Sequence, residues 1–551
     1  VCVKKLRFGS EFSLWIRIGK VDSSLRFDQP NMTYIEGESR DQELLLPESI
    51  EDYVSEENPV RFVEAFVDQL DMEECGFERR IGKTRGRPSY NPRDLLKLYL
   101  FGYMNRNRSS RMLERACHVN LEAIWLMRKL KPDHKTIAEF RRKNPKAFKQ
   151  CFRKFVLLCR NLGLLGSDLV AIDGTKLKGV NSPRKNLTRS KLQRMIKDAD
   201  AKLEDYFKRL DDQDARDHNG RKTNKKKLRK RIDMIEGQLA AMKELEKSME
   251  DAGLTQISKT DEDSRSMPKN PRVGVGYNGQ AGADEKHGMI VAEDLTNEIH
   301  DYDQLAPIAK QAKDNLGSPE KLKIAADKGY DKASQMRAVE DSGMQCYVAS
   351  REYSRQIGGA LYGKDAFRYL KTKDSYKCPA DAILPRKHEI EVNGRLRIAY
   401  HNSAACDACS IREKCTANKK GRIVYRYRDE EVAAMVRKRM EANPEVYKRR
   451  GPTVEKCFGS IKWAMGCENL LMKGLKKCRG EWSLMCLCYN LKRAISILGV
   501  EKLVEAVLKR HLRTKSDSVV LIVPLIAILR SENAVGPVFS KTINPIKIAF
   551  C

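Results

Sequence analysis

Apolar residues recur at helical spacing through the first third of the chain. A helix is predicted to begin near residue 59, because Phe62 and Phe66 fall on one face of a 3.6-residue repeat. A second helix is predicted after Pro92, since proline suits the first turn of a helix. Shorter helical patterns follow at residues 109–118, 121–128 and 134–143. These short helices with basic surfaces predict an all-α N-terminal domain of helix-turn-helix type over residues 45–150.

Residues 185–253 have a different pattern. Apolar residues recur at helical spacing from Leu192 to Leu210, stop at residues 214–224, and resume from Leu228 to Leu245. This pattern predicts an antiparallel helical hairpin. Residues 221–231 contain eight Lys or Arg, among them Lys226 and Arg229. Such a charge run is usually a solvated face, but it can also hold a DNA backbone.

Short apolar runs typical of strands surround the hairpin. They are found at residues 169–172, 273–282, 288–294 and 324–326, with a helical pattern at residues 305–312 before the last of them. Strands that alternate with helices predict an α/β architecture, and the hairpin is then an insertion in that domain. We expect the domain to cover residues 165–500, with a second insertion at residues 350–420.

Three acidic residues stand at the ends of these predicted elements. Asp173 and Asp327 each follow an apolar run, and we expect the chain to turn tightly after both; Glu455 opens a helical stretch and shares a face with Lys462. Singly, a turn aspartate or a first-turn glutamate is ordinary. Together, three carboxylates flanked by cations can hold two Mg²⁺ ions for phosphodiester chemistry.

Charge indicates the class of partner. The chain has 551 residues, enough for roughly two to four domains, and 105 Lys and Arg against 75 Asp and Glu give it a net charge of +30. A charge of this sign and size favours DNA as the partner over a membrane surface. The longest apolar run, residues 519–529, is interrupted by Pro524 and is shorter than the about 20 residues that span a bilayer. We therefore expect a cytoplasmic, nucleoid-associated protein.

The two ends of the chain differ from the remainder. Residues 1–31 contain no periodic element, and we interpret them as a non-native or disordered leader before a start at Met32. Residues 501–551 form a tail rich in Val, Ile and Leu.

Two basic segments of the N-terminal domain are candidate DNA contacts. Arg85 and Arg87 belong to an Arg-Gly-Arg-Pro core that fits a narrow minor groove, although a basic linker between helices is the favoured alternative. Arg141 and Arg142 lie in a segment that is either a recognition helix or a helix whose apolar residues pack inward while its basic residues are solvated.

Four cysteines are candidate metal ligands. Cys406 and Cys409 form a CxxC pair, Cys415 follows, and Cys378 precedes them at a longer spacing. Four thiolates in this order can form a structural Zn²⁺ site that closes a loop-rich insertion. The alternative is that several of them are buried free thiols.

Several longer motifs are spread over the chain from about residue 32 to residue 500. They are Asn58-Pro59-Val60-Arg61, Gly86-Arg87-Pro88-Ser89-Tyr90, Arg108-Ser109-Ser110-Arg111, Ala171-Ile172-Asp173-Gly174, Gly276-Tyr277-Asn278, Ala326-Asp327-Lys328-Gly329-Tyr330, Val454-Glu455-Lys456-Cys457-Phe458-Gly459 and Tyr489-Asn490-Leu491-Lys492-Arg493. In these motifs the chain resembles the DDE transposases of bacterial insertion sequences, in particular the branch of the IS eleven-eighty-two type.

The resemblance implies an RNase H-like catalytic domain in which Asp173, Asp327 and Glu455 are the metal ligands. It also implies a Tyr-x2-Arg-x3-Glu-x6-Lys signature, matched by Tyr447, Arg450, Glu455 and Lys462 with one extra residue between arginine and glutamate. Tyr447, Lys462 and the arginines near Glu455 are then expected to contact the DNA, but the role of Arg450 as against Arg449 stays open. The implied activity is Mg²⁺-dependent cleavage and strand transfer of DNA by a homodimer.

Two other functions remain open. A catalytically inactive DNA-binding relic of a transposase is one, because both ends of the chain look altered. An RNase H-like nuclease that hydrolyses DNA without joining it is the other.

Overall fold

The computed structural model describes residues 5–8, 12–15, 49–77, 89–216, 222–267, 274–350, 361–392 and 395–509. Contacts divide the chain into two units, Val1–Asp52 and Tyr53–Cys551. In the first unit β1 (Lys5–Phe8) pairs antiparallel with β2 (Phe12–Trp15), so this segment contains regular structure where the sequence predicted none. Most of the predicted leader and nearly all of the C-terminal tail lie outside the described residues.

The second unit begins with helices that follow the sequence prediction. They are α1 (Pro59–Asp68), α2 (Pro92–Met104), α3 (Ser110–Val119), α4 (Leu121–Leu126) and α5 (His134–Lys143). A further helix, α6 (Pro145–Asn161), follows α5 in a segment for which no helix was predicted. Asn58 and Asn91 cap α1 and α2, because each side chain accepts a hydrogen bond from a backbone N–H of the first turn. A proline then occupies the first position of both helices, where its missing N–H costs nothing.

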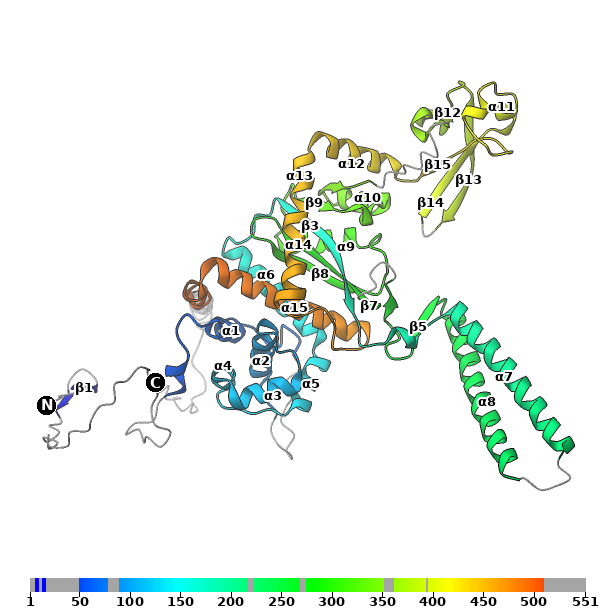
Figure 1. Cartoon of the computed structure of the whole chain (residues 1–551). Helices are drawn as coiled ribbons and strands as arrows, with labels where there is room; N and C mark the ends of the chain where they lie inside the picture. The colour runs from blue at the N-terminus through cyan, green and yellow to red at the C-terminus, as the bar shows by residue number, and fades with distance from the viewer. Residues whose placement is uncertain are drawn as a thin grey trace, which may run out of the picture. The chain divides into compact units, whose positions relative to one another are not determined.

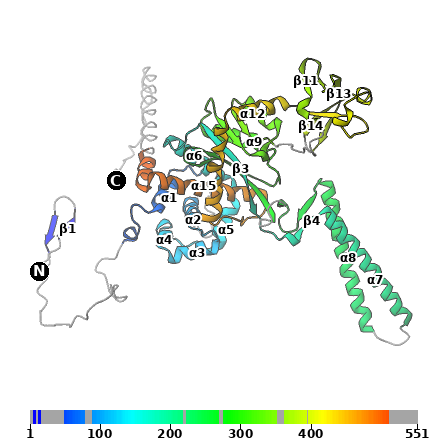
Figure 2. The same ribbon diagram turned by 45° about the horizontal axis from the view of Figure 1, so that its top comes forward.

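Two long helices, α7 (Arg189–Arg216) and α8 (Lys222–Asp251), occupy the segment predicted as a hairpin. They lie side by side in Figures 1 and 2 and share an apolar seam that includes Leu192, Ile196 and Met242. Before and after them, β4 (Asn186–Thr188) pairs antiparallel with β5 (Gln256–Ser258).

A six-stranded sheet forms the centre of the second unit. Its strands are β3 (Leu169–Lys178), β6 (Arg265–Ser266), β7 (Val275–Asp284), β8 (Met289–Thr296), β9 (Lys323–Ala326) and β10 (Gln345–Val348). The order is β10-β9-β3-β7, and β7 pairs with both β6 and β8. The β10, β9 and β3 strands are parallel, whereas β7 is antiparallel to β3 and β8 is antiparallel to β7.

One sequence prediction about this sheet is wrong. Asp173 does not end its strand, because β3 continues to Lys178 and stays paired with β7 throughout. What ends near Asp173 is the pairing of β3 with β9, which runs only to Ile172. The aspartate therefore lies at the edge left by the shorter strand. The other aspartate behaves as predicted: β9 ends at Ala326, and Asp327 caps the tight turn that follows.

Helices cover both faces of the sheet (Figure 1). They are α9 (Leu305–Asn315), α10 (Ala333–Asp341), α12 (Glu430–Ala442), α13 (Pro444–Lys448), α14 (Arg450–Gly459) and α15 (Leu475–Leu498). Successive residues of a strand face opposite sides. Gly279 of β7 lies against Trp482 of α15, and Gly282 lies against Ile308 of α9, so these two helices pack on opposite faces.

The α15 helix joins the N-terminal helices to the sheet. It is buried along most of its length and packs on α6, α2 and β8. At Gly480 an added Cβ would lie 2.4 Å from the Cα of Pro145 in α6, so glycine permits the close approach of the two helices. On its other side the Asn490 amide bonds both backbone groups of Ile290 in β8.

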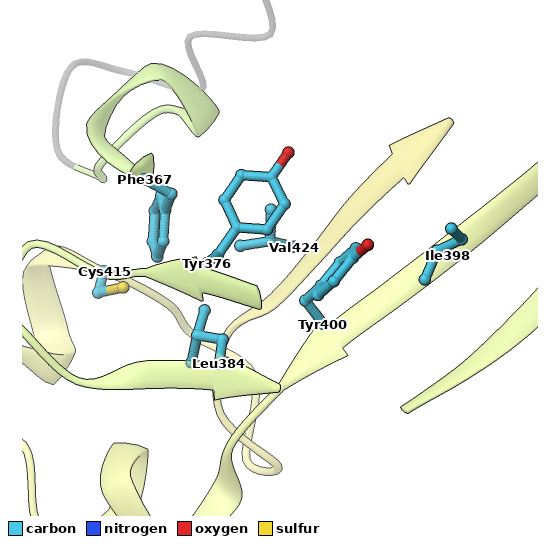
Figure 3. Packing of buried hydrophobic residues seen from close by; sticks show 7 residues of the cluster. All are labelled: Phe367, Tyr376, Leu384, Ile398, Tyr400, Cys415 and Val424. Carbon is cyan, nitrogen blue, oxygen red and sulfur yellow. The ribbon is translucent and has the colours of Figure 1, made fainter. Parts of the chain in front are cut away.

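A second, smaller sheet lies between β10 and α12 in the sequence. Its strands, in spatial order and all antiparallel, are β11 (Arg368–Leu370), β12 (Ser375–Lys377), β13 (Ile383–Val392), β14 (Arg395–His401) and β15 (Ile423–Tyr427). The short helix α11 (Ser403–Asp407) follows β14. Figure 3 shows the apolar cluster of this sheet, in which Tyr376 and Tyr400 lie close together and Cys415 is a member.

Candidate active site

Asp173 and Asp327 are brought side by side by the parallel pairing of β3 with β9. Ile172 is in register with Ala326, so the aspartates are the next residues on two adjacent strands. Adjacent strands lie about 4.8 Å apart. The Asp173 carboxylate accepts a hydrogen bond from the N–H of Gly174 at 2.7 Å, and that of Asp327 accepts one from the N–H of Gly329 at 2.7 Å. Both side chains are therefore fixed by the backbone that follows them.

Glu455 reaches this edge from α14, in the second turn of the helix. Arg450, in the first turn of α14, links the two sides: its guanidinium donates to Asp173 at 3.0 Å and lies 3.8 Å from the Glu455 carboxylate. The Glu455 side chain is 66% exposed, so it is the member of the set most open to a ligand. Arg450 thus links two of the three predicted acids, and the third, Asp327, is the neighbour of Asp173 on the adjacent strand.

Burial and charge act against each other at Asp173. Burial raises the pKa of its carboxyl above the ordinary value, the Arg450 guanidinium opposes that rise, and the negative charge of Asp327 adds to it. The site therefore holds two neighbouring carboxylates that repel each other and a cation that partly compensates them. Any further cation bound there would relieve the same repulsion.

Arg449 and Arg450 have different roles in the fold. Arg449 forms a two-pronged ion pair with Glu285, at 2.9 and 2.8 Å, away from the three acids. Arg450 is the arginine at the acids, and its guanidinium also lies over the ring of Tyr447, 5.9 Å from the ring centroid. Arg450 is thus the arginine that faces the site, although it is separated from Glu455 by one residue more than in the signature.

The helix does not run as a regular α-helix from Glu455 to Lys462, as the sequence predicted. An α-helical course from Glu455 would put the two residues on one face, but α14 ends at Gly459 and a π-helical turn, Ser460–Ala464, follows. The wider turn changes the angle between successive side chains. Lys462 is half-buried, and burial lowers the pKa of its ammonium, with the charge of Glu468 opposing and that of Lys176 adding.

Two charged residues that the sequence analysis did not select lie at the same edge. Asp301, in the loop after β8, receives hydrogen bonds on Oδ1 from Asn278 at 2.7 Å and Gln280 at 2.8 Å. Lys176 of β3 lies 3.3 Å from the same oxygen. Burial lowers the pKa of the Lys176 ammonium, while the charges of Asp301, Asp173 and Asp327 oppose that change.

The candidate DNA contacts outside this edge differ in their exposure. Lys226 and Arg229 are exposed on α8, and Arg142 is exposed but paired with Glu139 at 2.6 Å. Arg85 and Arg87 lie outside the described residues.

Arg141 was a candidate DNA contact, but the structure shows that it is buried. Its side chain is 8% exposed, donates to the Tyr103 hydroxyl at 3.0 Å, and lies 3.9 Å from the fully buried Glu481 of α15. The residue shares the buried face of α5 with Ile137 and Phe140. It therefore belongs to the core and is not available to DNA.

The four candidate zinc ligands belong to the smaller sheet and the loops around it. Cys415 is buried in the apolar cluster of that sheet, and Cys378 packs against the cluster. Burial raises the pKa of the Cys415 thiol, the charge of Arg422 opposes the rise, and charges on Cys406, Cys378 and Cys409 would add to it. Cys406 and His401 both approach Gly421. The structure thus gathers the cysteines in one region.

No group of three or more His, Cys, Asp or Glu side chains in the described part of the chain is arranged to hold a metal ion. The donors at Asp173, Asp327 and Glu455 are nevertheless carboxylate oxygens, the ligands that Mg²⁺ prefers. The Arg450 guanidinium lies where a cation is favoured, between two of these carboxylates. The chemistry of the donor set therefore fits a divalent ion that shares this charge with Arg450.

None of the described helices is long and apolar enough by itself to cross a bilayer. One bent pair among them, Leu475–Leu498 with Val500–Lys509, has the length and composition of a span.

Comparison with known proteins gives two family matches. The family described as Transposase domain (DUF772) matches residues 48–143, which include helices α1 to α5, and the family described as Transposase DDE domain matches residues 377–495. The second match includes Glu455 and Lys462, whereas Asp173 and Asp327 lie before it. No curated protein and no solved structure matches the chain. The two matches support an insertion-sequence transposase, and with it DNA as the partner and transposition as the class of activity.

Proposed function

We propose that this chain is a transposase of the IS eleven-eighty-two type that cuts and joins DNA at the edge formed by Asp173, Asp327 and Glu455. One observation carries the proposal. Residues separated by well over a hundred positions meet there, with Asp173 and Asp327 adjacent across β3 and β9 and with Arg450 between Asp173 and Glu455. A carboxylate cluster on a chain of charge +30 suits a phosphodiester substrate.

The catalytic domain in this proposal is RNase H-like, interrupted by α7 and α8 and by the smaller sheet. The strand order supports it: β8, β7 and β3 form an antiparallel meander, and β9 and β10 continue the sheet in parallel after helical connections. Both aspartates then stand at neighbouring strands, and the glutamate comes from a later helix. The N-terminal helices would be the DNA-binding domain.

Asp173, Asp327 and Glu455 are proposed to hold two Mg²⁺ ions. When bound, Mg²⁺ supplies Lewis-acid stabilisation of the attacking and leaving oxygens of an in-line displacement. The protein's own side chains bind and orient the DNA. Arg450, Tyr447 and Lys462 would contact phosphates near the scissile bond, and Arg449 would support α14 through Glu285. Because water and then the freed 3′ hydroxyl are the nucleophiles, no covalent protein nucleophile is needed.

Other parts of the proposal concern assembly. A homodimer would bring the two element ends together on chromosomal DNA in the cytoplasm. The exposed Lys226 and Arg229 would follow the DNA backbone, and Arg142, Arg85 and Arg87 would do so in the N-terminal domain. Cys378, Cys406, Cys409 and Cys415 would hold a structural Zn²⁺, a role that metal analysis of the purified protein tests, since a zinc content near zero would remove it.

The decisive experiment uses the DNA that flanks the reading frame. End-labelled duplexes with its inverted repeats are incubated with the protein and Mg²⁺. Joined products support a transposase, cleavage alone supports a nuclease, and bound but uncut DNA supports an inactive relic. Asp173→Ala is expected to abolish cleavage while DNA retention persists. Loss of both activities in a folded variant would contradict the role of Asp173.

A further inference from the structure

Asp301 is held in place by two buried amides of the central sheet. Asn278 and Gln280 of β7 are both fully buried, and each donates to Asp301 Oδ1, at 2.7 and 2.8 Å. To do so, Asn278 leaves its own buried Oδ1 without a hydrogen-bond partner. Gln280 in turn accepts from the hydroxyl of Tyr330, in the turn after Asp327. A loop carboxylate is thereby fixed to the strand and to the turn that carry the site.

Gly174, the residue after Asp173, makes room for this carboxylate. A Cβ at position 174 would lie 2.6 Å from Asp301 Oδ1 and 2.6 Å from Gln280 Nε2. Contacts that short do not occur, so only glycine allows Asp301 to approach the strand here. The glycine next to a predicted catalytic aspartate therefore has a use beyond backbone flexibility.

Lys176 is the cationic partner of Asp301 in the described part of the chain. The ammonium lies 3.3 Å from Asp301 Oδ1, and this is its sole polar contact among the described residues. A lysine ammonium carries three donor hydrogens, so it has capacity to bind oxygen atoms of a ligand. Its side chain is 20% exposed, which leaves a path for such a ligand.

Lys176 and Arg450 lie on opposite faces of the central sheet. Gly174 and Lys176 are in register with Gln280 and Asn278, on the face of the sheet covered by α9, whereas Arg450 approaches Asp173 from α14 on the other face. Lys176 and Arg450 thus flank the Asp173–Asp327 pair from opposite sides. A phosphate that approaches these carboxylates is repelled by them, and a cation on each side offsets that repulsion.

We propose that Lys176 binds a phosphate of the DNA at the carboxylate edge and that Asp301 is the positioning residue that holds the Lys176 ammonium there. The inference rests on the proposed function and adds to it a further phosphate-binding cation, on the face opposite Arg450. Asp301 is not expected to touch the DNA, because its Oδ1 is already engaged by two amides and the lysine.

The test compares Lys176→Met, Asp301→Asn and the double variant in the full-length protein. The change at Asp301 keeps the shape and the amide hydrogen bonds but removes the charge. The matched controls are Asp303→Asn and Lys332→Met, which remove an aspartate–lysine pair between the residue two positions after Asp301 and the N-cap residue of α10. Three quantities are measured: the Mg²⁺-dependent cleavage rate at saturating flanking DNA, the salt dependence of duplex binding in EDTA, and the thermal midpoint.

Lys176→Met is expected to slow cleavage by about ten- to a hundredfold, as loss of a charge-assisted hydrogen bond does. It should also lower the slope of log affinity against log salt by about one. Asp301→Asn is expected to slow cleavage several-fold, although removal of a negative charge near DNA would by itself favour binding. The double variant should be no slower than Lys176→Met alone, because both changes remove one interaction. Lys176→Arg should retain more activity than Lys176→Met.

The proposal is overturned if Asp301→Asn cleaves at the wild-type rate or faster, if the two losses multiply, or if Lys176→Met leaves the salt slope unchanged. Variants whose thermal midpoint falls no more than that of the controls exclude misfolding. If the wild type does not cleave at all, the proposed function fails, but the salt slope and the non-additivity of the pair in DNA binding still decide the role of Lys176 and Asp301.

Discussion

Two clusters of charge in this molecule contain arginines and carboxylates, and they are built in opposite ways. Around Glu481 a single fully buried carboxylate accepts from the Tyr103 hydroxyl and from the N–H groups of Leu471 and Met472, with Arg108 and Arg141 each 3.9 Å away. Around Asp173, several carboxylates share fewer cations at an open edge. In the first cluster both carboxylate oxygens of Glu481 accept hydrogen bonds. In the second cluster, carboxylate oxygens such as those of the exposed Glu455 are accessible to a ligand.

The difference separates a structural cluster from a candidate functional one. A buried carboxylate with all its partners stabilises one packing of α15 against the N-terminal helices, and nothing there is available to a ligand. An edge with excess negative charge is a poor way to stabilise a fold, and it becomes favourable when a cation or a cation-bound substrate arrives. Substitutions should therefore separate the two clusters into effects on activity and effects on stability.

The largest expected effect is on cleavage. Asp327→Asn should lower the rate of DNA cleavage by at least about 10³-fold, because one carboxylate of a cooperating set is lost. The free energy of unfolding should change little, since asparagine can still accept the hydrogen bond from Gly329. Asp168→Asn is the control, because Asp168 pairs with Lys323 at 2.9 Å at the other end of the same two strands. A cleavage rate equal to that of this control would contradict the assignment of Asp327.

The next effect is on stability at the other cluster. Glu481→Ala leaves two buried arginines without their carboxylate and should lower the free energy of unfolding by about 3–5 kcal/mol. Urea denaturation measures this loss. Glu505→Ala, which breaks an exposed pair with Lys509, should cost less than about 1 kcal/mol. Equal losses in the two variants would show that the Glu481 cluster is not structural.

The next expected effect is on the pH dependence of stability, at the buried carboxyl group of Glu293 in β8. It accepts from the Ser483 hydroxyl at 2.8 Å, and burial raises the pKa of its carboxyl to about 7. The unfolded chain ionises this group near its ordinary pKa of 4.5, so stability falls as the pH rises from there through about 7. Glu293→Gln should therefore raise the free energy of unfolding by about 2–3 kcal/mol at pH 8 and not at pH 4. An equal change at both pH values would contradict burial of the charge.

The smallest effect concerns charges on the α7–α8 pair that have no fixed partner among the described residues. Lys226→Ala with Arg229→Ala should lower the salt slope of DNA binding by about two and weaken binding to all sequences alike. Cleavage at saturating DNA should be unchanged. Lys243→Ala, which removes a cation paired with Asp200 on the same helices, is the control. A salt slope that stays at the wild-type value would show that the basic segment of α8 is only solvated.

The fold could be read from the sequence where local signals decide it. Helices α1 to α5 follow caps, prolines and apolar periodicity, and the β9 strand ends immediately before Asp327 as its composition indicates. The extension of β3 beyond Asp173 could not be read in this way, because Gly174 and Thr175 resemble a turn until the long partner β7 is known. The π-helical turn that contains Lys462 could not be read from the sequence either, because no residue type marks it.

The candidate site could also be predicted only in part, because only some of its residues carry local signals in the sequence. Its acids carry local signals at the ends of predicted elements, whereas Asp301 lies in an irregular loop, 125 residues from Lys176, and only tertiary pairing joins them. Arg141 shows that a usable signal was present. Ile137, Phe140 and Arg141 fall on one helical face, so the buried side of α5 could have been inferred from its apolar members.

The most direct test of the central claim is a comparison of DNA cleavage by Asp173→Asn, Asp327→Asn, Glu455→Gln and the variant with all three changes. If the three carboxylates act as one site, each single change should remove nearly all cleavage, and the triple variant should be no slower than the singles. A single variant that cuts at the wild-type rate, or losses that multiply in the triple variant, would contradict a shared site.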